Sequence, residues 1–355
     1  MKVLVVGGGL IGTSIALKVA KLGGSARVTD QISAHARVAN ELLGGAILGE
    51  RAEPDLVVVA TPVNTIGDVV IEQLLLNPRA IIIDTGSIKT KVLLEVSTKL
   101  EHLTRSAELK RFLPTHPMAG RELSGPDGAR SDLFEGRAWA ITPTRQNQPE
   151  TVKSVEEFVI ALGATPYRMS PEEHDQQVAM TSHLPQLMAS AIAALLDGPL
   201  DLAGQGLRDM TRLAHSDIAM WQPIFAGNSD AISALVEKVI KSINQLKDKQ
   251  FSSEAVLSLM SAGALGAAKV PGKHGGVSRN YGSLSVVIPD RAGELARLFN
   301  DCAAAKINIE DLRIEHSPGQ ETGLISLYVK PDDLSTLDNY LSTLGWHATA
   351  LSKGN

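Results

Sequence analysis

The sequence predicts three folding units in succession: a doubly wound α/β domain, an all-helical domain, and a small α+β domain with a ferredoxin-like βαββαβ order. Three observations lead to this prediction. Short β-rich runs alternate with helical periods in the first half of the chain. A capped helix start then opens a long stretch without β-type runs, and both kinds of element return after a glycine-rich linker. The domains are placed at residues 1–169, 170–270 and 281–352.

The first domain is expected to hold a parallel sheet. Continuously apolar runs, typical of strands buried on both faces, are found at 3–6, 26–29, 56–60 and 80–84. Helical periods separate them at 11–22, 33–43 and 65–76, which indicates βαβ units. Two further strands are expected at 111–114 and 138–141.

The second domain begins with the capping-box residues Ser170, Pro171 and Glu173. Helices are expected at 178–196, 232–246 and 253–264. After a linker at 270–280, strands are expected at 283–288, 308–315, 324–329 and 346–351, with helices at 294–305 and 334–344.

The composition excludes several classes of protein. Of 355 residues, 44% are hydrophobic and 21% charged, which is typical of a folded protein, and the net charge of -5 gives no basic surface for nucleic acid. The lone Cys302 excludes an internal disulfide and argues against a cysteine metal site. The apolar start ends at Gly7, too early for a signal peptide, and no apolar stretch has membrane-spanning length. We expect a soluble cytoplasmic protein that binds neither nucleic acid nor a membrane.

A glycine-rich loop between the first strand and the first helix indicates a Rossmann dinucleotide site. The spacing of Gly7, Gly9 and Gly12 fits G-x-G-x-x-G. The first glycine permits a tight turn, the second lets the backbone approach a pyrophosphate, and the third allows close packing of helix on strand. Leu10 and Ile11 complete the loop, so their amides at the helix start face the phosphates.

Asp30 indicates that the cofactor is NAD. It ends the second strand, 18 residues after Gly12, where a carboxylate binds the ribose 2′-hydroxyl and repels the 2′-phosphate of NADP. Thr61 follows the strand ending at Ala60, on the same edge of the sheet. It either contacts the cofactor or belongs to an ordinary turn before Pro62.

Four more motifs lie where a doubly wound fold and its neighbour meet a ligand. In order along the chain, the five motifs are G-x-G-x-x-G, D-x-x-S-x-K at 84–89, H-P-M-x-G at 116–120, S-H-L-P at 182–185, and R-D-x-T-R at 208–212. With these five motifs in this order, the chain resembles the prephenate and arogenate dehydrogenases over essentially its whole length. The segment 289–295 also resembles the start of an ACT domain, which some members carry.

The resemblance implies an NAD-dependent prephenate dehydrogenase of tyrosine biosynthesis, which converts prephenate to 4-hydroxyphenylpyruvate, with arogenate dehydrogenase as the alternative. Hydride leaves the hydroxyl-bearing ring carbon, carbon dioxide is lost, and aromatisation drives the reaction without a metal. His116 is implied to polarise the hydroxyl as a neutral imidazole. Ser87 is implied to bond the same hydroxyl or the nicotinamide amide, and it is also a candidate N-cap of the next helix.

The remaining site residues are assigned to the substrate. Arg212 is implied to clamp a substrate carboxylate, unless it is a surface arginine paired with Asp209. His183 is either a substrate contact or a satisfied core histidine; Glu122 and Asp209 are assigned to substrate binding. We reject a zinc site, because His174 and His183 are nine residues apart and lack a carboxylate at metal-ligand spacing.

The ACT resemblance implies that an amino acid effector, expected to be the end product tyrosine, binds near Asp290, Gly293 and Asn308. The alternative is a purely structural dimer module. We expect a homodimer or a higher homo-oligomer, because the long apolar helices of the second domain exceed what one chain buries.

Two other kinds of protein remain as alternatives. Another dehydrogenase of this layout, such as a β-hydroxyacid dehydrogenase or a pyrroline-carboxylate reductase, is disfavoured by the motif at His116-Pro117-Met118. A regulator that binds NAD and an amino acid without turnover would be excluded by turnover of any cyclohexadienyl substrate.

Overall fold

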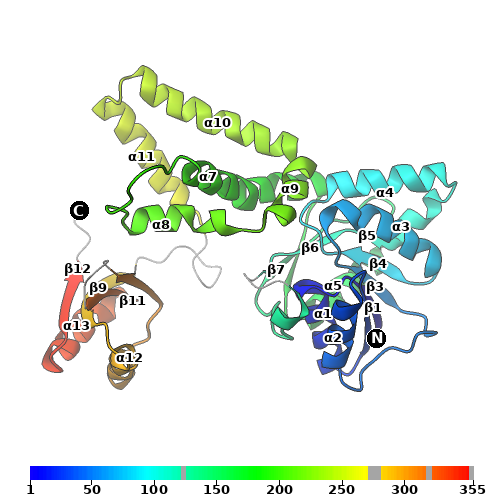
Figure 1. Cartoon of the computed structure of the whole chain (residues 1–355), viewed down its shortest axis with the longest axis horizontal. Coiled ribbons are helices and arrows are strands. Elements are labelled where there is room, and N and C mark those ends of the chain that lie inside the picture. Colours follow the sequence, from blue (N-terminus) through cyan, green and yellow to red (C-terminus); the bar gives the residue numbers. More distant parts are fainter. Residues whose placement is uncertain (121–124, 271–280, 317–321, 352–355) are drawn as a thin grey trace. The chain divides into compact units, whose positions relative to one another are not determined.

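The computed structural model describes residues 1–120, 125–270, 281–316 and 322–351 (Figure 1). It consists of two compact units, Met1–Lys241 and Ser242–Asn355, and the division falls inside helix α10 (Ser229–Asp248). No helix among these described residues is long and apolar enough to cross a lipid bilayer.

The first unit contains a five-stranded parallel sheet in the order β2-β1-β3-β4-β5. Its strands are β1 (Lys2–Val6), β2 (Ser25–Thr29), β3 (Leu56–Val59), β4 (Ile81–Asp84) and β5 (Phe112–Leu113). The helices that connect them are α1 (Leu10–Lys21), α2 (Ser33–Leu42), α3 (Ile66–Leu76) and α4 (Thr90–His102). Because the order reverses between β1 and β3, the crevice at the carboxyl ends of these two strands is the ligand position of such a sheet. The predicted doubly wound Rossmann domain is confirmed.

Both faces of this sheet are buried. Val3 and Val5 of β1 belong to one apolar cluster, with residues of α1 and α2, and Leu4 between them belongs to another, with residues of α3 and α4. Figure 1 shows the two helix pairs on opposite sides of the sheet. Successive side chains of a strand point to opposite faces, so a strand covered on both sides is apolar at every position. This is the physical reason why the continuous runs predicted parallel strands correctly.

A second, three-stranded sheet extends the domain. It is formed by β6 (Thr115–Pro117), β7 (Ala138–Ile141) and β8 (Thr165–Arg168), and α5 (Pro149–Ala161) joins the last two. The strand expected at 111–114 is shorter than predicted: it ends at Leu113, and after Pro114 the chain pairs antiparallel with β7. Strand β8 was not predicted, because it is largely exposed and lacks an apolar run.

The helical part of this unit starts at the predicted capping box. The Ser170 hydroxyl accepts from the Glu173 amide at 3.1 Å, and the Glu173 carboxylate accepts from the Ser170 amide at 2.8 Å. The elements that follow are α6 (Pro171–Val178), a π-helix (Ala179–His183), α7 (Leu184–Ala193), α8 (Gln205–Thr211), a 3₁₀ turn (Arg212–His215), α9 (Ile218–Gly227) and α10. The helix predicted at 178–196 is therefore interrupted. The wide π-helical turn lies just before Pro185. The backbone nitrogen of Pro185 has no hydrogen, so it cannot donate to the carbonyl oxygen four residues earlier.

The second unit holds α11 (Ser253–Ala267) and a four-stranded antiparallel sheet in the order β10-β11-β9-β12. The elements are β9 (Gly282–Pro289), α12 (Glu294–Ala304), β10 (Asp311–His316), β11 (Thr322–Val329), α13 (Leu334–Thr343) and β12 (His347–Leu351). The chain order is β, α, β, β, α, β, and both helices pack on the sheet around Leu284, Leu298 and Leu337.

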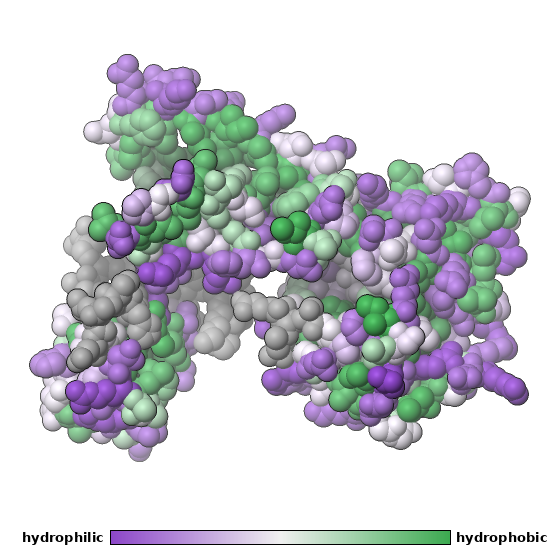
Figure 2. All heavy atoms as spheres, in the orientation of Figure 1, coloured by the Kyte–Doolittle hydropathy of each residue, from purple (hydrophilic) through white to green (hydrophobic). Residues whose placement is uncertain are grey.

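Apolar side chains remain exposed on α10 and α11 when one chain is considered alone. Ile240 and Ile243 of α10 are 51% and 53% exposed, and Leu257, Met260 and Leu265 of α11 are 68%, 67% and 69% exposed. Figure 2 shows hydrophobic surface over this part of the chain. Several large apolar residues exposed together are typical of an interaction surface.

Candidate active site

The glycine loop after β1 is shaped by close backbone contacts. Gly7 has a φ of +114°, and a Cβ there would lie 2.3 Å from the Ala60 carbonyl oxygen. A Cβ on Gly12 would lie 2.0 Å from the Gly7 carbonyl oxygen. At Gly9, the N-cap of α1, a Cβ would meet no atom within 4 Å. Two of the glycines are thus required by packing, and the third leaves open space at the helix N-terminus, which is the space that a pyrophosphate needs.

Asp30 is tied to this loop from the end of β2. Its Oδ2 accepts from the Gly8 amide at 2.6 Å, and its Oδ1 accepts from the Ile32 amide at 2.7 Å. Each carboxylate oxygen has a further lone pair, so the group can also accept from a ribose hydroxyl. Leu10 and Ile11 occupy the first turn of α1 and are half-buried.

Two hydroxyls at the carboxyl edge of the sheet are buried without a hydrogen-bond partner in the described part of the chain. They are Thr61 Oγ1, after β3, and Ser87 Oγ, after β4. Ser87 does not cap the following helix, because α4 begins at Thr90 with Lys89 as its N-cap residue. A buried hydroxyl without a partner is costly, and a bound ligand that hydrogen-bonds it removes this cost. Together with the open space at Gly9, these hydroxyls fit a dinucleotide at this edge.

Lys89, the last residue of D-x-x-S-x-K, is fully buried with Asp84. Both side chains are 0% exposed, and the Lys89 ammonium binds the Asp84 carboxylate and donates to the Thr115 carbonyl oxygen at 2.7 Å. The Asp84 carboxylate also accepts from the amides of Gly86 at 2.9 Å and Thr115 at 3.1 Å. Burial lowers the pKa of Lys89, and the neighbouring Asp84 opposes this effect. The pair joins the end of β4 to the start of β6, which carries His116.

His116 contacts a second histidine and, through it, an aspartate. Its Nδ1 lies 2.9 Å from His174 Nε2, and His174 Nδ1 lies 2.8 Å from Asp175 Oδ1. His116 is half-buried on β6, whereas His174 and Asp175 of α6 are 1% and 5% exposed. The two carboxylate oxygens of Asp175 also accept from the backbone amides of Lys89 and Thr90 at the start of α4, at 2.8 and 2.9 Å.

The electrostatics of this cluster favour neutral histidines. Burial, with smaller repulsion from His174, Lys89 and His183, holds the pKa of His116 well below its usual range. Burial also lowers the pKa of His174, against the opposing effect of Asp175. Desolvation raises the pKa of Asp175, but hydrogen bonds from His174 and from the start of α4 outweigh it and lower that pKa overall. At neutral pH His116 is therefore an uncharged imidazole able to accept a proton.

His183 closes the cluster from the π-helix. It is 1% exposed, and its Nδ1 lies 3.2 Å from Asn228 Nδ2. Asn228, the C-cap of α9, also donates to the backbone carbonyl of Asp175 at 2.7 Å. Burial lowers the pKa of His183 to about 4. π-helical turns are found frequently at functional sites.

The other predicted residues lie outside this contact network. Arg212 is exposed at the start of its 3₁₀ turn, and no hydrogen bond or ion pair joins it to His116 among the described residues. Asp209 accepts from Gln205 at 2.9 Å. Glu122 lies outside the described residues. Asp290 and Gly293 follow β9, and Asn308 donates to the Glu310 carboxylate at 3.2 Å.

Sequence reasoning considered His174 only as a zinc ligand, which it rejected, and it did not single out Asp175 or Asn228. One signal was present for α6. Its buried residues are Pro171, His174, Asp175 and Val178, which are the positions of the core-facing stripe of an amphipathic helix. Two polar side chains at core positions predict a buried interaction partner.

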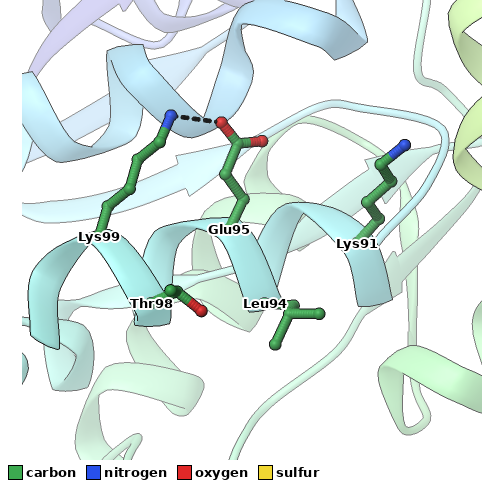
Figure 3. A pocket seen from close by; sticks show the side chains of 5 residues that line it. All are labelled: Lys91, Leu94, Glu95, Thr98 and Lys99. Carbon is green, nitrogen blue, oxygen red and sulfur yellow. Dashed lines mark hydrogen bonds and ion pairs between the residues drawn. The ribbon is translucent and has the colours of Figure 1, made fainter. Parts of the chain in front are cut away.

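A shallow hollow of about 350 Å³ is separate from this cluster. It lies on α4 and is lined by Lys91, Leu94, Glu95, Thr98 and Lys99 (Figure 3). The Lys99 ammonium is already bound to Glu95 and Asp68, both at 2.6 Å. None of the predicted site residues lines this hollow, so we do not place the active site there.

Comparisons with known proteins identify the family of this chain. Residues 46–167 match the family described as prephenate dehydrogenase, nucleotide-binding domain, and residues 170–259 match prephenate dehydrogenase, dimerization domain. A probable prephenate dehydrogenase of Streptomyces niveus is 29% identical over 98% of this chain and 99% of its own length. The cyclohexadienyl dehydrogenase of Zymomonas mobilis is 30% identical over 55% of this chain and 67% of its own length.

Two solved structures are similar as well. Prephenate dehydrogenase from Aquifex aeolicus, in complex with hydroxyphenyl propionate and NAD+, has a TM-score of 0.65 and 28% identity, covering 75% of this chain and 97% of that one. Synechocystis arogenate dehydrogenase has a TM-score of 0.64 and 25% identity, covering 76% of this chain and 100% of that one.

Proposed function

Because the chain belongs to the prephenate dehydrogenase family, we propose that it catalyses the NAD-dependent oxidative decarboxylation of prephenate to 4-hydroxyphenylpyruvate. The observation that carries this proposal is His116. It is a neutral, half-buried imidazole on the strand that follows the carboxyl edge of the sheet, connected to the buried Asp84–Lys89 pair through Thr115. A proton acceptor in that position is what oxidation of a ring hydroxyl requires.

The cofactor is held by the glycine loop and the two strand ends beside it. Gly7, Gly9 and Gly12 shape the pyrophosphate position, with the first turn of α1 at Leu10 and Ile11. Asp30 accepts from a ribose hydroxyl. Thr61, whose buried hydroxyl has no hydrogen-bond partner among the described residues, forms a hydrogen bond with the ligand. When bound, NAD supplies the hydride acceptor for the ring carbon that bears the hydroxyl.

The side chains around His116 carry the rest of the reaction. His116 accepts the hydrogen bond of the substrate hydroxyl and takes its proton as the carbon is oxidised. The ring carboxylate then leaves as carbon dioxide, its bonding electrons complete the aromatic ring, and the proton returns to the phenol oxygen. Ser87, whose buried hydroxyl has no partner among the described residues, donates to the same oxygen or to the nicotinamide amide.

Substrate binding is assigned to four further residues. Arg212 forms a bidentate pair with a substrate carboxylate, with Asp209 beside it in the motif, and Glu122 orients the pocket. His183 lies in the buried cluster beside Asn228, which favours a role in shaping the pocket wall. Arogenate, which carries an amino group where prephenate has a keto group, is the alternative substrate, and similarity to an arogenate dehydrogenase favours testing it.

The domains at 1–169 and 170–270 supply this site, and the second also pairs two chains. The dimerization-domain match at 170–259 and the exposed apolar residues of α10 and α11 support a homodimer or higher homo-oligomer. We propose that 281–352 is an ACT-type regulatory domain, since its antiparallel sheet has the order β10-β11-β9-β12 with two helices packed on it. The effector, an aromatic amino acid such as tyrosine, binds near Asp290, Gly293 and Asn308.

The test is the appearance of NADH absorbance with prephenate and with arogenate, each with and without tyrosine. Turnover of prephenate supports the proposal, and turnover of arogenate alone transfers the assignment to the alternative. NAD binding without turnover of either would indicate a regulator that binds NAD and an amino acid. Tyrosine-dependent inhibition supports the regulatory domain, and its absence favours a structural dimer module.

A further inference from the structure

Asp175 and His174 connect the first turn of α4 to His116, the proposed proton acceptor. We call these three hydrogen-bonded side chains the line. Asp175 Oδ1 lies 2.8 Å from His174 Nδ1, and His174 Nε2 lies 2.9 Å from His116 Nδ1. The two histidine rings meet edge to face, with centroids 5.2 Å apart and an interplanar angle of 73°. Neither Asp175 nor His174 is needed for the proposed chemistry itself, so their burial beside His116 requires another explanation.

The position of Asp175 is fixed by hydrogen bonds to its carboxylate and to its backbone. Its Oδ1 accepts from the Lys89 amide and its Oδ2 from the Thr90 amide, at 2.8 and 2.9 Å. These amides belong to the start of α4, where the helix dipole stabilises a negative charge. Asn228 donates to the backbone carbonyl of Asp175 at 2.7 Å, so three helices position this one residue.

The charge of Asp175 sets the direction of both hydrogen bonds. An ionised carboxylate only accepts, so His174 Nδ1 must carry a hydrogen. In a neutral His174, Nε2 is then a lone-pair acceptor, and His116 Nδ1 must donate to it. The neighbouring Lys89 and the burial of the ring both oppose a second proton on His174.

We propose that His174 and Asp175 are positioning residues that hold His116 in the tautomer with hydrogen on Nδ1, so that His116 Nε2 is the proton acceptor. This inference rests on the proposed function, because it assigns a role in the same site. Without the line, an imidazole is free to carry its hydrogen on Nε2, where it cannot accept the substrate proton. The same logic applies to the carboxylate that orients the histidine of a Ser-His-Asp triad.

The groups that face His116 come from three elements and lead to the same protonation state. His174 on α6 accepts from it, Lys89 before α4 repels a second proton, and His183 of the π-helix is itself kept neutral by burial. Asp84, the counter-ion of Lys89, binds that ammonium and the Thr115 amide.

The proposal is tested with three variants of the whole 355-residue chain and one control. Asp175→Asn replaces the acceptor by a group that can donate to His174 and so reverse the line. His174→Phe removes both ring nitrogens, while His174→Gln keeps an oxygen that can accept from His116 Nδ1. Glu172→Gln makes the same carboxylate-to-amide change at an exposed position of the same helix and serves as the matched control.

Two readouts are taken. Steady-state kinetics with whichever of prephenate and arogenate the protein oxidises give kcat, KM and the pH profile of kcat. The ¹⁵N chemical shifts of labelled histidines identify which ring nitrogen of His116 is protonated, with the resonances assigned by their loss in His116→Asn. The spectrum is recorded on the unaltered protein as well, so it remains informative if a variant fails to fold.

In the unaltered protein we expect hydrogen on Nδ1 of His116 and none on Nε2 at neutral pH. Asp175→Asn should lower kcat by about 10²- to 10⁴-fold with little change in KM, as expected for a wrong tautomer. His174→Phe should behave similarly, His174→Gln should recover at least about tenfold over it, and Glu172→Gln should match the unaltered protein.

Hydrogen on Nε2 of His116 in the unaltered protein would overturn the proposal, whatever the kinetics. So would an unchanged kcat in Asp175→Asn and His174→Phe. If the unaltered protein turns over neither substrate, the proposed function fails, while the spectra of the unaltered protein and Asp175→Asn still decide whether the line sets the tautomer.

Discussion

The buried Lys89–Asp84 pair allows a quantitative prediction about stability. Replacing Lys89 by Met keeps the length of the side chain but removes the charge opposite Asp84, and both side chains are 0% exposed. A buried carboxylate left without its counter-ion costs about 3–5 kcal/mol. The Thr115 carbonyl oxygen also loses the donor that lies 2.7 Å away. We therefore expect a free energy of unfolding lower by at least about 3 kcal/mol.

The assay is thermal unfolding followed by circular dichroism. In a unit of this size each kcal/mol corresponds to about 2–4 °C, so Lys89→Met should lower Tm by roughly 6–20 °C. Asp84→Asn and the double variant complete a thermodynamic cycle. The double variant should be about 1–3 kcal/mol more stable than the sum of the single changes predicts, because neither charge is then left alone.

The matched control is Lys153→Met. Lys153 lies 3.8 Å from Glu157 on α5, but the two side chains are 75% and 66% exposed, so the change should cost no more than about 0.5 kcal/mol. If the Tm of Lys89→Met lies within about 2 °C of that of the unaltered protein, or if the two single changes are additive, the buried pair does not stabilise the fold.

Three further predictions concern the site. His116→Asn should lower kcat by about 10²–10⁴-fold with an unchanged circular dichroism spectrum, and near-normal turnover would refute its role as proton acceptor. Asp30→Ala should raise KM for NAD by roughly 10- to 100-fold, because the charged hydrogen bond to the ribose is lost. It should also reduce the preference for NAD over NADP, because the repulsion of the 2′-phosphate is lost. An unchanged ratio of kcat/KM for NAD and NADP would refute the assignment. Burial lowers the pKa of His183 to about 4, so between pH 6.5 and about 4 the unfolded chain binds the proton first. The free energy of unfolding should therefore fall by up to about 3 kcal/mol as the pH drops through this window. In urea unfolding experiments, the free energy of unfolding of His183→Gln should depend less on pH than that of the unaltered protein.

Local patterns were sufficient for most of the secondary structure. The apolar runs of β1 to β4 and the capping box at Ser170 depend on neighbours within a few residues, and the structure has them where they were predicted. The predicted helix at 178–196 and the predicted strand at 111–114 were wrong in extent, in both cases beside a proline, Pro185 and Pro114. A proline predicts that a regular element is disturbed, but whether it ends or widens depends on what the freed backbone groups meet.

The glycine loop was also predictable residue by residue. The need for Gly7 and Gly12 follows from backbone atoms that approach within 2.3 and 2.0 Å of an added Cβ, and this approach is a property of any strand–loop–helix unit of this type. The spacing of the motif therefore predicted the close backbone contacts at Gly7 and Gly12. The same holds for Asp30, which directly follows β2, the strand adjacent to that loop.

By itself, the sequence determined the doubly wound sheet, the cofactor loop and the position of His116 at the carboxyl edge, because each depends on local periodicity and chain order. Only the tertiary structure decided which side chains surround His116. His174 lies 58 residues from it along the chain, and Asp175 lies 86 residues from the Lys89 amide that it binds. Such pairs form when α6 docks on the start of α4, and docking depends on the shape and burial of whole helices. Because buried polar groups need hydrogen-bond partners, partners were required for His174 and Asp175 on the buried face of α6. Only the packing of the helices determined which residues those partners are.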